Sequence, residues 1–235
     1  MRGRLLRIFD LLLEHFGQRH WWPGDTPLEV SVGAILTQNC AWRNVEKAID
    51  NLKGRALLEL DALHRIRTDE LADIIRPSGF YNIKSKRLKS FTKVLVDEYD
   101  GSFDILRAYR LSDLRERLLA VNGLGPETAD SILLYALEKP IFVIDAYTKR
   151  FVTNHGLVKA GNDLAYDDLQ LLFMDHLPHD TYLYNEFHAL IVRLCQTYCK
   201  KVPLCVGCPL KGERDLGDSS VAPPHFRVYN QQSGI

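Results

Sequence analysis

The sequence predicts an all-α protein, chiefly because apolar residues recur at spacings of three and four along almost the whole chain. Alternating runs of β-branched residues are nearly absent, and the one short extended candidate, at 141–144, directly follows Pro140. The 235 residues are 46% hydrophobic and 26% charged, a composition typical of a globular chain that buries its own core. No apolar run reaches the roughly 18 residues that a membrane-spanning helix needs, so we expect no membrane partner.

In the first half of the chain, glycine and proline mark the turns between helices. The first helix has an apolar stripe that includes Leu5 and Leu12, and it ends before the turn WWPGDTP at 21–27. Further breaks at 76–80 and 100–103 delimit the helices that follow. We therefore expect helices near 2–16, 28–38, 43–53, 68–75 and 82–98.

The second half continues this pattern. A stripe of leucines from Leu111 to Leu119 precedes NGLGP at 122–126, and Pro126 suits the first position of a new helix. The segment KPIFVID at 139–145 marks the next break. We expect helices near 111–120, 126–138, 145–155, 164–176 and 181–199, followed by an irregular tail at 211–235 that is polar and without period.

The overall charge gives no support for a nucleic-acid partner, since 30 basic residues balance 30 acidic ones. The distribution is uneven, however: between Arg76 and Lys93 there are six basic residues and no acidic one. Lys84, Lys86 and Arg87 within this stretch are candidates for contacts with a DNA backbone. A solvated helix face is the alternative interpretation.

The segment LAVNGLGPETAD at 119–130 predicts two helices joined by a very tight turn. Glycine at positions 123 and 125 permits backbone angles that other residues avoid and lets another chain approach closely. Amides of such a turn bind a phosphate without any lysine. The candidate DNA contacts here are Asn122, Gly123, Leu124 and Gly125. An ordinary glycine-capped helix connection is the alternative.

These motifs together resemble a known superfamily. VNGLGPETADSILLYAL, followed by VIDAYTKRF, is similar to the helix-hairpin-helix signature and downstream aspartate of the endonuclease III superfamily of DNA glycosylases. ILTQNCAWRNVEKAIDNL at 35–52 resembles its early helix and loop. The resemblance implies two helical domains flanking a DNA-binding cleft: a six-helix domain at 25–137 with the hairpin, and a second domain built from 1–24 plus 138–210. The implied partner is double-stranded DNA with damaged bases, bound by a monomer.

The resemblance also assigns the chemistry. Asp145 matches the aspartate that stabilises the sugar cation and orients the attacking water, which is what loss of a base from deoxyribose requires. A helix N-cap is the alternative role for Asp145. Glu127 stands where members that also cut the backbone carry a lysine, and a carboxylate cannot form a Schiff base. We take Asp145 and Glu127 as the catalytic candidates and expect hydrolysis without lyase activity.

A narrower resemblance points to the 3-methyladenine DNA glycosylase III branch, through WWP at 21–23, LTQN with Trp42, RPSGFYNIKSKRL at 76–88, and Glu127. It implies a base pocket walled by aromatic and proline side chains. An N-alkylated purine is cationic, and indole faces attract cations. Core packing is the alternative role for the tryptophans. The pocket candidates are Trp21, Trp22, Pro23 and Trp42.

Two neighbouring amides, Gln38 and Asn39, match the side chains that fill the gap left in the duplex when a base flips out. Capping of the preceding helix is the alternative role for this pair.

Four of the five cysteines, Cys195, Cys199, Cys205 and Cys208, fall within fourteen residues. Four thiolates without histidine suit either a [4Fe-4S] cluster or tetrahedral zinc. The superfamily resemblance favours [4Fe-4S], although the last cysteine of the usual order is missing and Cys195 stands upstream instead. The cluster would have a structural role, and it would place Lys200 and Lys201 at DNA phosphates.

The sequence therefore predicts a monofunctional DNA glycosylase of base excision repair that excises alkylated purines such as 3-methyladenine. One alternative is an endonuclease III-like pyrimidine or mismatch glycosylase, with or without lyase activity. Another, from a different class, is a non-catalytic DNA-damage-binding protein. Without a signal-peptide pattern or a disulfide framework, we expect a cytoplasmic protein, nucleoid-associated in a prokaryote.

Overall fold

A computed structural model describes residues 1–158 and 164–214. These ranges contain helices, turns and loops but no strand, so the predicted all-α class is confirmed. No helix within them combines the length and the apolar character that crossing a membrane requires. The predicted irregular tail begins with a short 3-10 helix, η3 (Lys211–Arg214), and its remainder, 215–235, lies outside the described residues.

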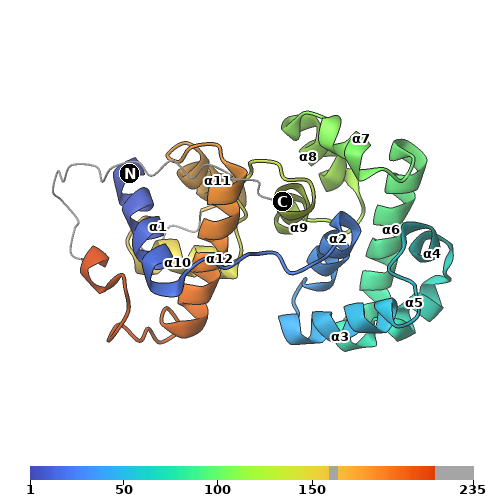
Figure 1. Cartoon of the computed structure of the whole chain (residues 1–235), viewed down its shortest axis with the longest axis horizontal. Coiled ribbons are helices and arrows are strands. Elements are labelled where there is room, and N and C mark those ends of the chain that lie inside the picture. The colour runs from blue at the N-terminus through green and yellow to red at the C-terminus, as the bar shows by residue number, and fades with distance from the viewer. Residues whose placement is uncertain (159–163, 215–235) are drawn as a thin grey trace, which may run out of the picture.

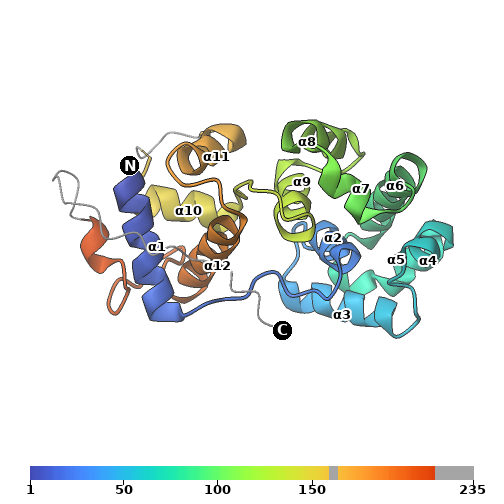
Figure 2. The ribbon, with the colours of Figure 1, turned by 45° about the horizontal axis from the view of Figure 1, so that its top comes forward.

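The helices form two lobes, which separate along the long axis of the molecule (Figures 1 and 2). One lobe contains α2 (Pro27–Leu36), α3 (Trp42–Lys53), α4 (Leu60–Arg65), α5 (Thr68–Ile74), η1 (Arg76–Ser78), α6 (Tyr81–Tyr99), α7 (Phe103–Ala108), α8 (Leu111–Ala120) and α9 (Pro126–Ser131). The other contains α1 (Arg2–Phe16), α10 (Ala146–Asn154), α11 (Tyr166–Met174) and α12 (Thr181–Thr197). To these lobes we assign the predicted domains 25–137 and 1–24 with 138–210.

The observed helices match the ten expected segments closely, and the differences lie in short elements. The first lobe has eight α-helices between residues 25 and 137 instead of six, because α4 and α7 were not predicted. Each is six residues long, too short for a three-to-four periodicity to show. The segment expected as one helix at 126–138 is α-helical only through α9 and then continues as a π-helical turn, η2 (Ile132–Ala136).

The turn η2 connects the two lobes, since it packs against α2 in one and α12 in the other. Buried apolar residues of both lobes form a single continuous cluster. In the second lobe Phe142 stacks on Phe173, with ring centroids 4.0 Å apart and planes 3° from parallel. The lobes therefore share one core.

A buried polar network also joins the lobes. Asp130 on α9 is fully buried and accepts hydrogen bonds from Arg115 on α8, with 2.8 Å between Arg115 Nε and Asp130 Oδ1. Gln170 on α11 donates to Asp130 Oδ2 and to the carbonyl of Phe142, at 2.7 Å in each case. The hydroxyl of Tyr166 accepts the amide proton of Ile144 at 3.2 Å. This network fixes the segment that leads into α10.

Candidate active site

A cavity of about 330 Å³ opens between the lobes, a size within the usual range of small-molecule sites. Both lobes contribute to its lining, which comes from the segment before α2, from α2, α3, α9, α10 and α12, and from the loops beside them. Pro23, predicted as a pocket wall, is exposed and does not line the cavity. Seven predicted site residues do line it: Trp21, Trp22, Gln38, Asn39, Trp42, Glu127 and Asp145.

Three indole rings make the aromatic side of this cavity. The ring centroids of Trp22 and Trp42 are 5.1 Å apart with planes at 89°, and those of Trp21 and Trp22 are 5.4 Å apart at 67°. Gly33 on α2 makes room for this arrangement, since a Cβ there would lie only 3.2 Å from Trp22 Nε1. Trp22 also packs on Tyr135 of η2, with centroids 5.1 Å apart.

Asp145 stands at the N-terminus of α10 and borders the cavity. Its Oδ1 caps the helix by accepting the Thr148 amide at 2.7 Å and the Thr148 hydroxyl at 2.9 Å. Its Oδ2 lies 3.6 Å from His188 Nε2 on α12. Burial opposes ionisation of Asp145, but His188 and the two donors of Thr148 outweigh it and lower the pKa of this carboxyl group. Asp145 is thus both a cap and a fixed anion, with Oδ2 left to face a substrate.

Glu127 approaches the same cavity from the first turn of α9. Loss of solvent around its carboxyl group, followed by repulsion from Asp145, raises the pKa of Glu127. The two carboxyl groups therefore have pKa values displaced in opposite directions. Such a pair in one cleft is a mark of an active site in which the two acids have different roles.

Side chains from α6 and from the loop after α2 contact the tight turn between α8 and α9 and hold it in place. Gly123 has φ 89°, and a Cβ at this position would collide with the Arg87 side chain of α6. Arg87 donates to Gln38 Oε1, and Gln38 Nε2 donates to the carbonyl of Gly123 at 3.1 Å and to Thr128 Oγ1 at 2.8 Å. Gln38 and Arg87 therefore hold the hairpin in position.

Within the turn itself, Leu124 differs from its predicted role as a DNA contact. Its side chain is buried, and its amide donates to the carbonyl of Val121 at 3.1 Å. The amide is thus already used inside the turn. Asn122 and Gly125 are exposed.

The sequence matches a family model described as HhH-GPD superfamily base excision DNA repair protein over residues 32–172, which is more than half of the chain. The chain belongs to this superfamily. The HhH-GPD superfamily contains DNA glycosylases of the endonuclease III type, so the predicted superfamily is confirmed.

Curated relatives agree with this membership. A protein of Methanocaldococcus jannaschii, whose assignment as a DNA repair glycosylase is itself provisional, is 47% identical over 209 residues, covering 88% of this chain and 94% of the relative. Endonuclease III of Thermotoga maritima is 28% identical over 190 residues, covering 79% of this chain and 81% of the relative. The HhH-GPD chain is accordingly a base excision repair DNA glycosylase.

Solved structures show the same fold. The 3-methyladenine DNA glycosylase of H. pylori, bound to 1,N6-ethenoadenine, superposes with a TM-score of 0.71 at 30% identity, covering 83% of this chain and 97% of that one. This likeness supports the narrower resemblance to the 3-methyladenine branch. An endonuclease III trapped covalently on DNA superposes with a TM-score of 0.75 at 20% identity, over 92% of this chain and 98% of that one.

The basic stretch of this HhH-GPD chain serves mainly internal contacts. Lys84 is 1% exposed, and its Nζ donates to the carbonyls of Leu36 and Ser78 at 2.7 and 2.6 Å. Burial lowers the pKa of Lys84. The prediction that Lys84 contacts DNA is wrong, because the ammonium group ties the end of α2 to η1. Lys86, by contrast, is exposed on α6.

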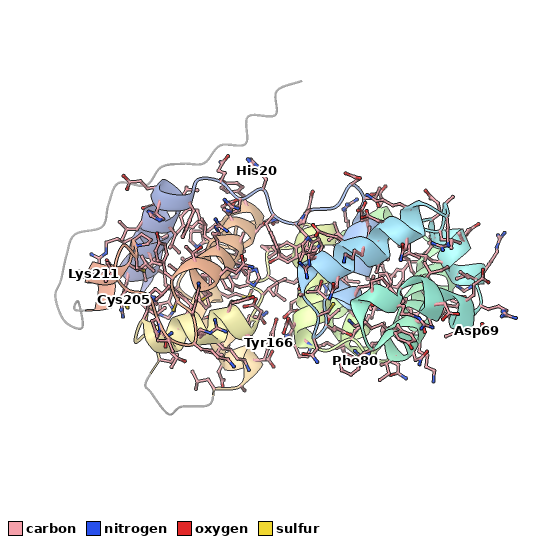
Figure 3. All side chains as sticks on the ribbon, turned by 90° about the horizontal axis from the view of Figure 1, so that it is seen from below. His20, Asp69, Phe80, Tyr166, Cys205 and Lys211 are labelled. Carbon is pink, nitrogen blue, oxygen red and sulfur yellow. The ribbon has the colours of Figure 1, made fainter. Side chains whose placement is uncertain are left out.

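Three cysteines, Cys199, Cys205 and Cys208, line a second, much smaller cavity together with His155. Figure 3 shows Cys205 at the end of its lobe that lies away from the other lobe. Cys195 is buried one turn earlier on α12, and its Sγ lies 3.5 Å from the carbonyl oxygen of Tyr147. In residues 1–158 and 164–214, no three His, Cys, Asp or Glu side chains are placed as ligands of one metal ion. Cysteine thiolates are suitable ligands for a metal ion or a metal cluster. In the described residues, however, the four sulfur atoms are not arranged around one point as ligands would be.

Sequence reasoning missed Tyr135 beside the cleft, and it noted Phe80 only as an aromatic residue within the basic stretch. Tyr135 bonds to His188 behind Asp145, but a tyrosine within an apolar helix gives no distinct signal. Phe80, labelled in Figure 3, is 63% exposed and has φ 47° at the N-terminus of α6.

Proposed function

We propose that this HhH-GPD chain is a monofunctional DNA glycosylase that removes alkylated purines, such as 3-methyladenine, from duplex DNA. One observation supports the proposal most strongly: three indoles and two carboxyl groups line the same cavity, and no lysine is among the residues that line it.

The cavity suits a flat cationic base. Indole faces attract cations, and the carboxylate of Glu127 at the cavity adds a negative charge. The H. pylori relative, which binds 1,N6-ethenoadenine, also accommodates a modified adenine.

Hydrolysis needs an anion beside the sugar. As the base leaves, positive charge develops on the deoxyribose, and a carboxylate close to it stabilises that state. Asp145 Oδ1 is occupied by Thr148, so Oδ2 is the oxygen that faces the sugar and orients a water molecule. A cationic purine departs as a neutral base, so no proton donor is required.

We expect free 3-methyladenine to be released from a duplex that contains it, with an abasic site left in the strand. High-performance liquid chromatography of the released base measures this, and an unmodified duplex of the same sequence is the control. Release of an oxidised pyrimidine but of no alkylated purine would favour the endonuclease III-like alternative and contradict the proposed substrate.

We expect no covalent adduct when borohydride is added during the reaction. Lyase activity requires an amine that attacks the sugar, and no lysine lines the cavity. Gel electrophoresis of the protein after incubation with abasic DNA checks this, with an endonuclease III as positive control. A stable protein–DNA adduct formed by the wild-type chain would contradict a purely hydrolytic mechanism.

For the duplex, we propose contacts from groups that the structure leaves accessible. Asn39 is exposed with φ 51° beside the cavity and is the better candidate to enter the gap left by the base, because the amide of Gln38 is already engaged. The exposed ring of Phe80 is suited to stack on a base, a contact worth roughly 1–3 kcal/mol. The further proposed backbone contacts are Lys86, Asn122, Gly123, Gly125, Lys200 and Lys201.

Lys84→Met should mainly lower stability, whereas Lys86→Met should mainly weaken DNA binding. Lys84→Met leaves two buried carbonyls without a donor, so the free energy of unfolding should fall by about 2 kcal/mol, while the salt dependence of DNA binding is unchanged. Lys86→Met should change stability by less than about 0.5 kcal/mol and reduce the slope of log K against log salt by about one. Urea unfolding and a salt titration of binding measure the two quantities. An unchanged slope in Lys86→Met would remove this residue from the DNA contacts.

We also propose that the cysteine site holds a [4Fe-4S] cluster, with zinc as the alternative. Support comes from the donor set, since three cysteines already open onto one cavity and Cys195 adjoins Cys199. The bound group would stabilise the loop and take no part in hydrolysis. The purified protein should absorb broadly near roughly 400 nm and contain iron, and Cys205→Ser should lose both. Zinc without this absorbance would favour the alternative.

A further inference from the structure

Behind Asp145 lies a pair of buried polar side chains, Tyr135 from η2 and His188 from α12. The Tyr135 hydroxyl lies 2.7 Å from His188 Nδ1, and His188 Nε2 lies 3.6 Å from Asp145 Oδ2. His188 is 4% exposed, and its Nε2 has no hydrogen-bond partner at normal distance in the described part of the chain. The imidazole therefore stands between a hydroxyl group and a carboxylate.

The state of Tyr135 decides which ring nitrogen carries the proton. Burial, reinforced by the charges of Asp145 and Glu127, raises the pKa of Tyr135 well above its usual value, so the hydroxyl keeps its proton. This proton is donated to His188 Nδ1, since the reverse arrangement would place the Nε2 lone pair against the carboxylate. The imidazole proton then lies on Nε2 and faces Asp145 Oδ2.

The two carboxyl groups of the cavity differ in the number of hydrogen-bond donors that face them. Asp145 receives the two donors of Thr148 on Oδ1 and faces His188 on Oδ2. The Glu127 carboxylate has no hydrogen-bond donor among the described residues. Asp145 is therefore the carboxyl group that fixed donors hold in its ionised form, whereas the exposed Glu127 relies on solvent.

We propose that Tyr135 and His188 are positioning residues, which hold a proton on His188 Nε2 against Asp145 Oδ2 so that Asp145, and not Glu127, is the anion at the sugar. This inference rests on the proposed glycosylase function. It also links the base pocket to the hydrolytic carboxylate, because Tyr135 is the ring on which Trp22 packs.

The pH dependence follows from the groups around the site. Those that act on Asp145 or Glu127 are Glu127 on α9, Tyr135 on η2, Lys149 on α10, and His188 and Cys195 on α12. Activity needs ionised Asp145, so the rate falls as the pH drops through its pKa. Removing the Nε2 donor raises that pKa, and the acid limb of the rate profile therefore moves to higher pH.

The test compares His188→Leu, His188→Gln and Tyr135→Phe with His179→Gln, a histidine substitution at an exposed position just before α12. In His188→Leu, the acid limb of single-turnover base release should move up by about one pH unit, so the rate on that limb should fall about tenfold while the rate at neutral pH changes little. His188→Gln keeps a donor and should lie between Leu and wild type. Tyr135→Phe should shift the limb in the same direction. His179→Gln should leave the profile unchanged, and the Kd for damaged duplex should stay within about twofold throughout.

A second readout separates this proposal from the function on which it rests. Titration of the Asp145 carboxyl carbon by ¹³C NMR, assigned with Asp145→Asn, reports its ionisation without any substrate. An upward shift of this titration in Tyr135→Phe and His188→Leu supports the pair even if no base is released, an outcome that would overturn only the proposed function. An unchanged titration in Tyr135→Phe and in either His188 variant overturns the pair. Tyr135→Phe preserves the shape of the side chain and decides the matter if the His188 variants fail to fold.

Discussion

The Asp145→Asn variant is expected to release alkylated base about 10³-fold more slowly than the wild type, a loss typical of removing one electrostatic group that acts on the transition state. The amide cannot supply the negative charge that the sugar cation needs. Asparagine is a good N-cap and retains an oxygen for the Thr148 donors. The fold and the shape of the cavity should therefore persist, and the loss should appear in the chemical step.

Single-turnover release of 3-methyladenine, together with equilibrium binding of the damaged duplex, measures this expectation. Binding should stay within about threefold of the wild type, because the substitution preserves the size of the side chain. Thr148→Val is an informative companion, since it removes one donor to Oδ1 and keeps the carboxylate. A rate for Asp145→Asn within tenfold of wild type would mean that another group performs the hydrolysis.

Arg115→Met is expected to lower the free energy of unfolding by about 3–5 kcal/mol, the usual effect of removing one partner of a buried ion pair. Asp130 is fully buried and would keep only the neutral side chains of Gln170 and Tyr166 as hydrogen-bond partners, with no positive charge beside it. Burial raises the pKa of Asp130, and Arg115 is the main group that opposes this effect. The loss is large because the remaining carboxylate has no route to solvent.

Urea unfolding followed by circular dichroism at pH 7 gives the value for Arg115→Met. Arg110→Met is the matched control, since Arg110 pairs with Asp113 on the surface of the same helix, and its loss should cost less than about 1 kcal/mol. The double variant Arg115→Met with Asp130→Leu should recover most of the stability, because neither charge is then left alone. A decrease of less than about 1 kcal/mol in the free energy of unfolding of Arg115→Met would show that the network does not hold the two lobes together.

Local sequence patterns were sufficient for the long helices, and the resemblance of the motifs to a known superfamily pointed to residues that line one cavity. Helix α8 was predicted at its observed bounds, because a leucine stripe and a glycine turn both mark its limits. Asp145 and the three tryptophans were identified from the motifs around them, through the resemblance to that superfamily. These features depend on residues close together in the chain.

Tertiary burial was beyond the reach of the same patterns. Lys84 and Lys86 are two residues apart in one basic stretch, yet one is buried and the other exposed. Which of them faces the protein depends on where α2 and η1 end, and both of those ends are fixed by contacts from elsewhere. The bond from Gln38 to the hairpin, between residues 85 positions apart, likewise has no local signature.

Gly33 affects the stability of α2 as well as the shape of the cavity beside it. A glycine in the middle of a helix costs roughly 0.5–1 kcal/mol relative to alanine, so α2 is less stable than a one-methyl change would make it. That methyl group would lie only 3.2 Å from Trp22 Nε1, so the indole would have to shift by a few tenths of an ångström. Gly33 thus trades part of the stability of its own helix for the position of an indole in the cavity wall.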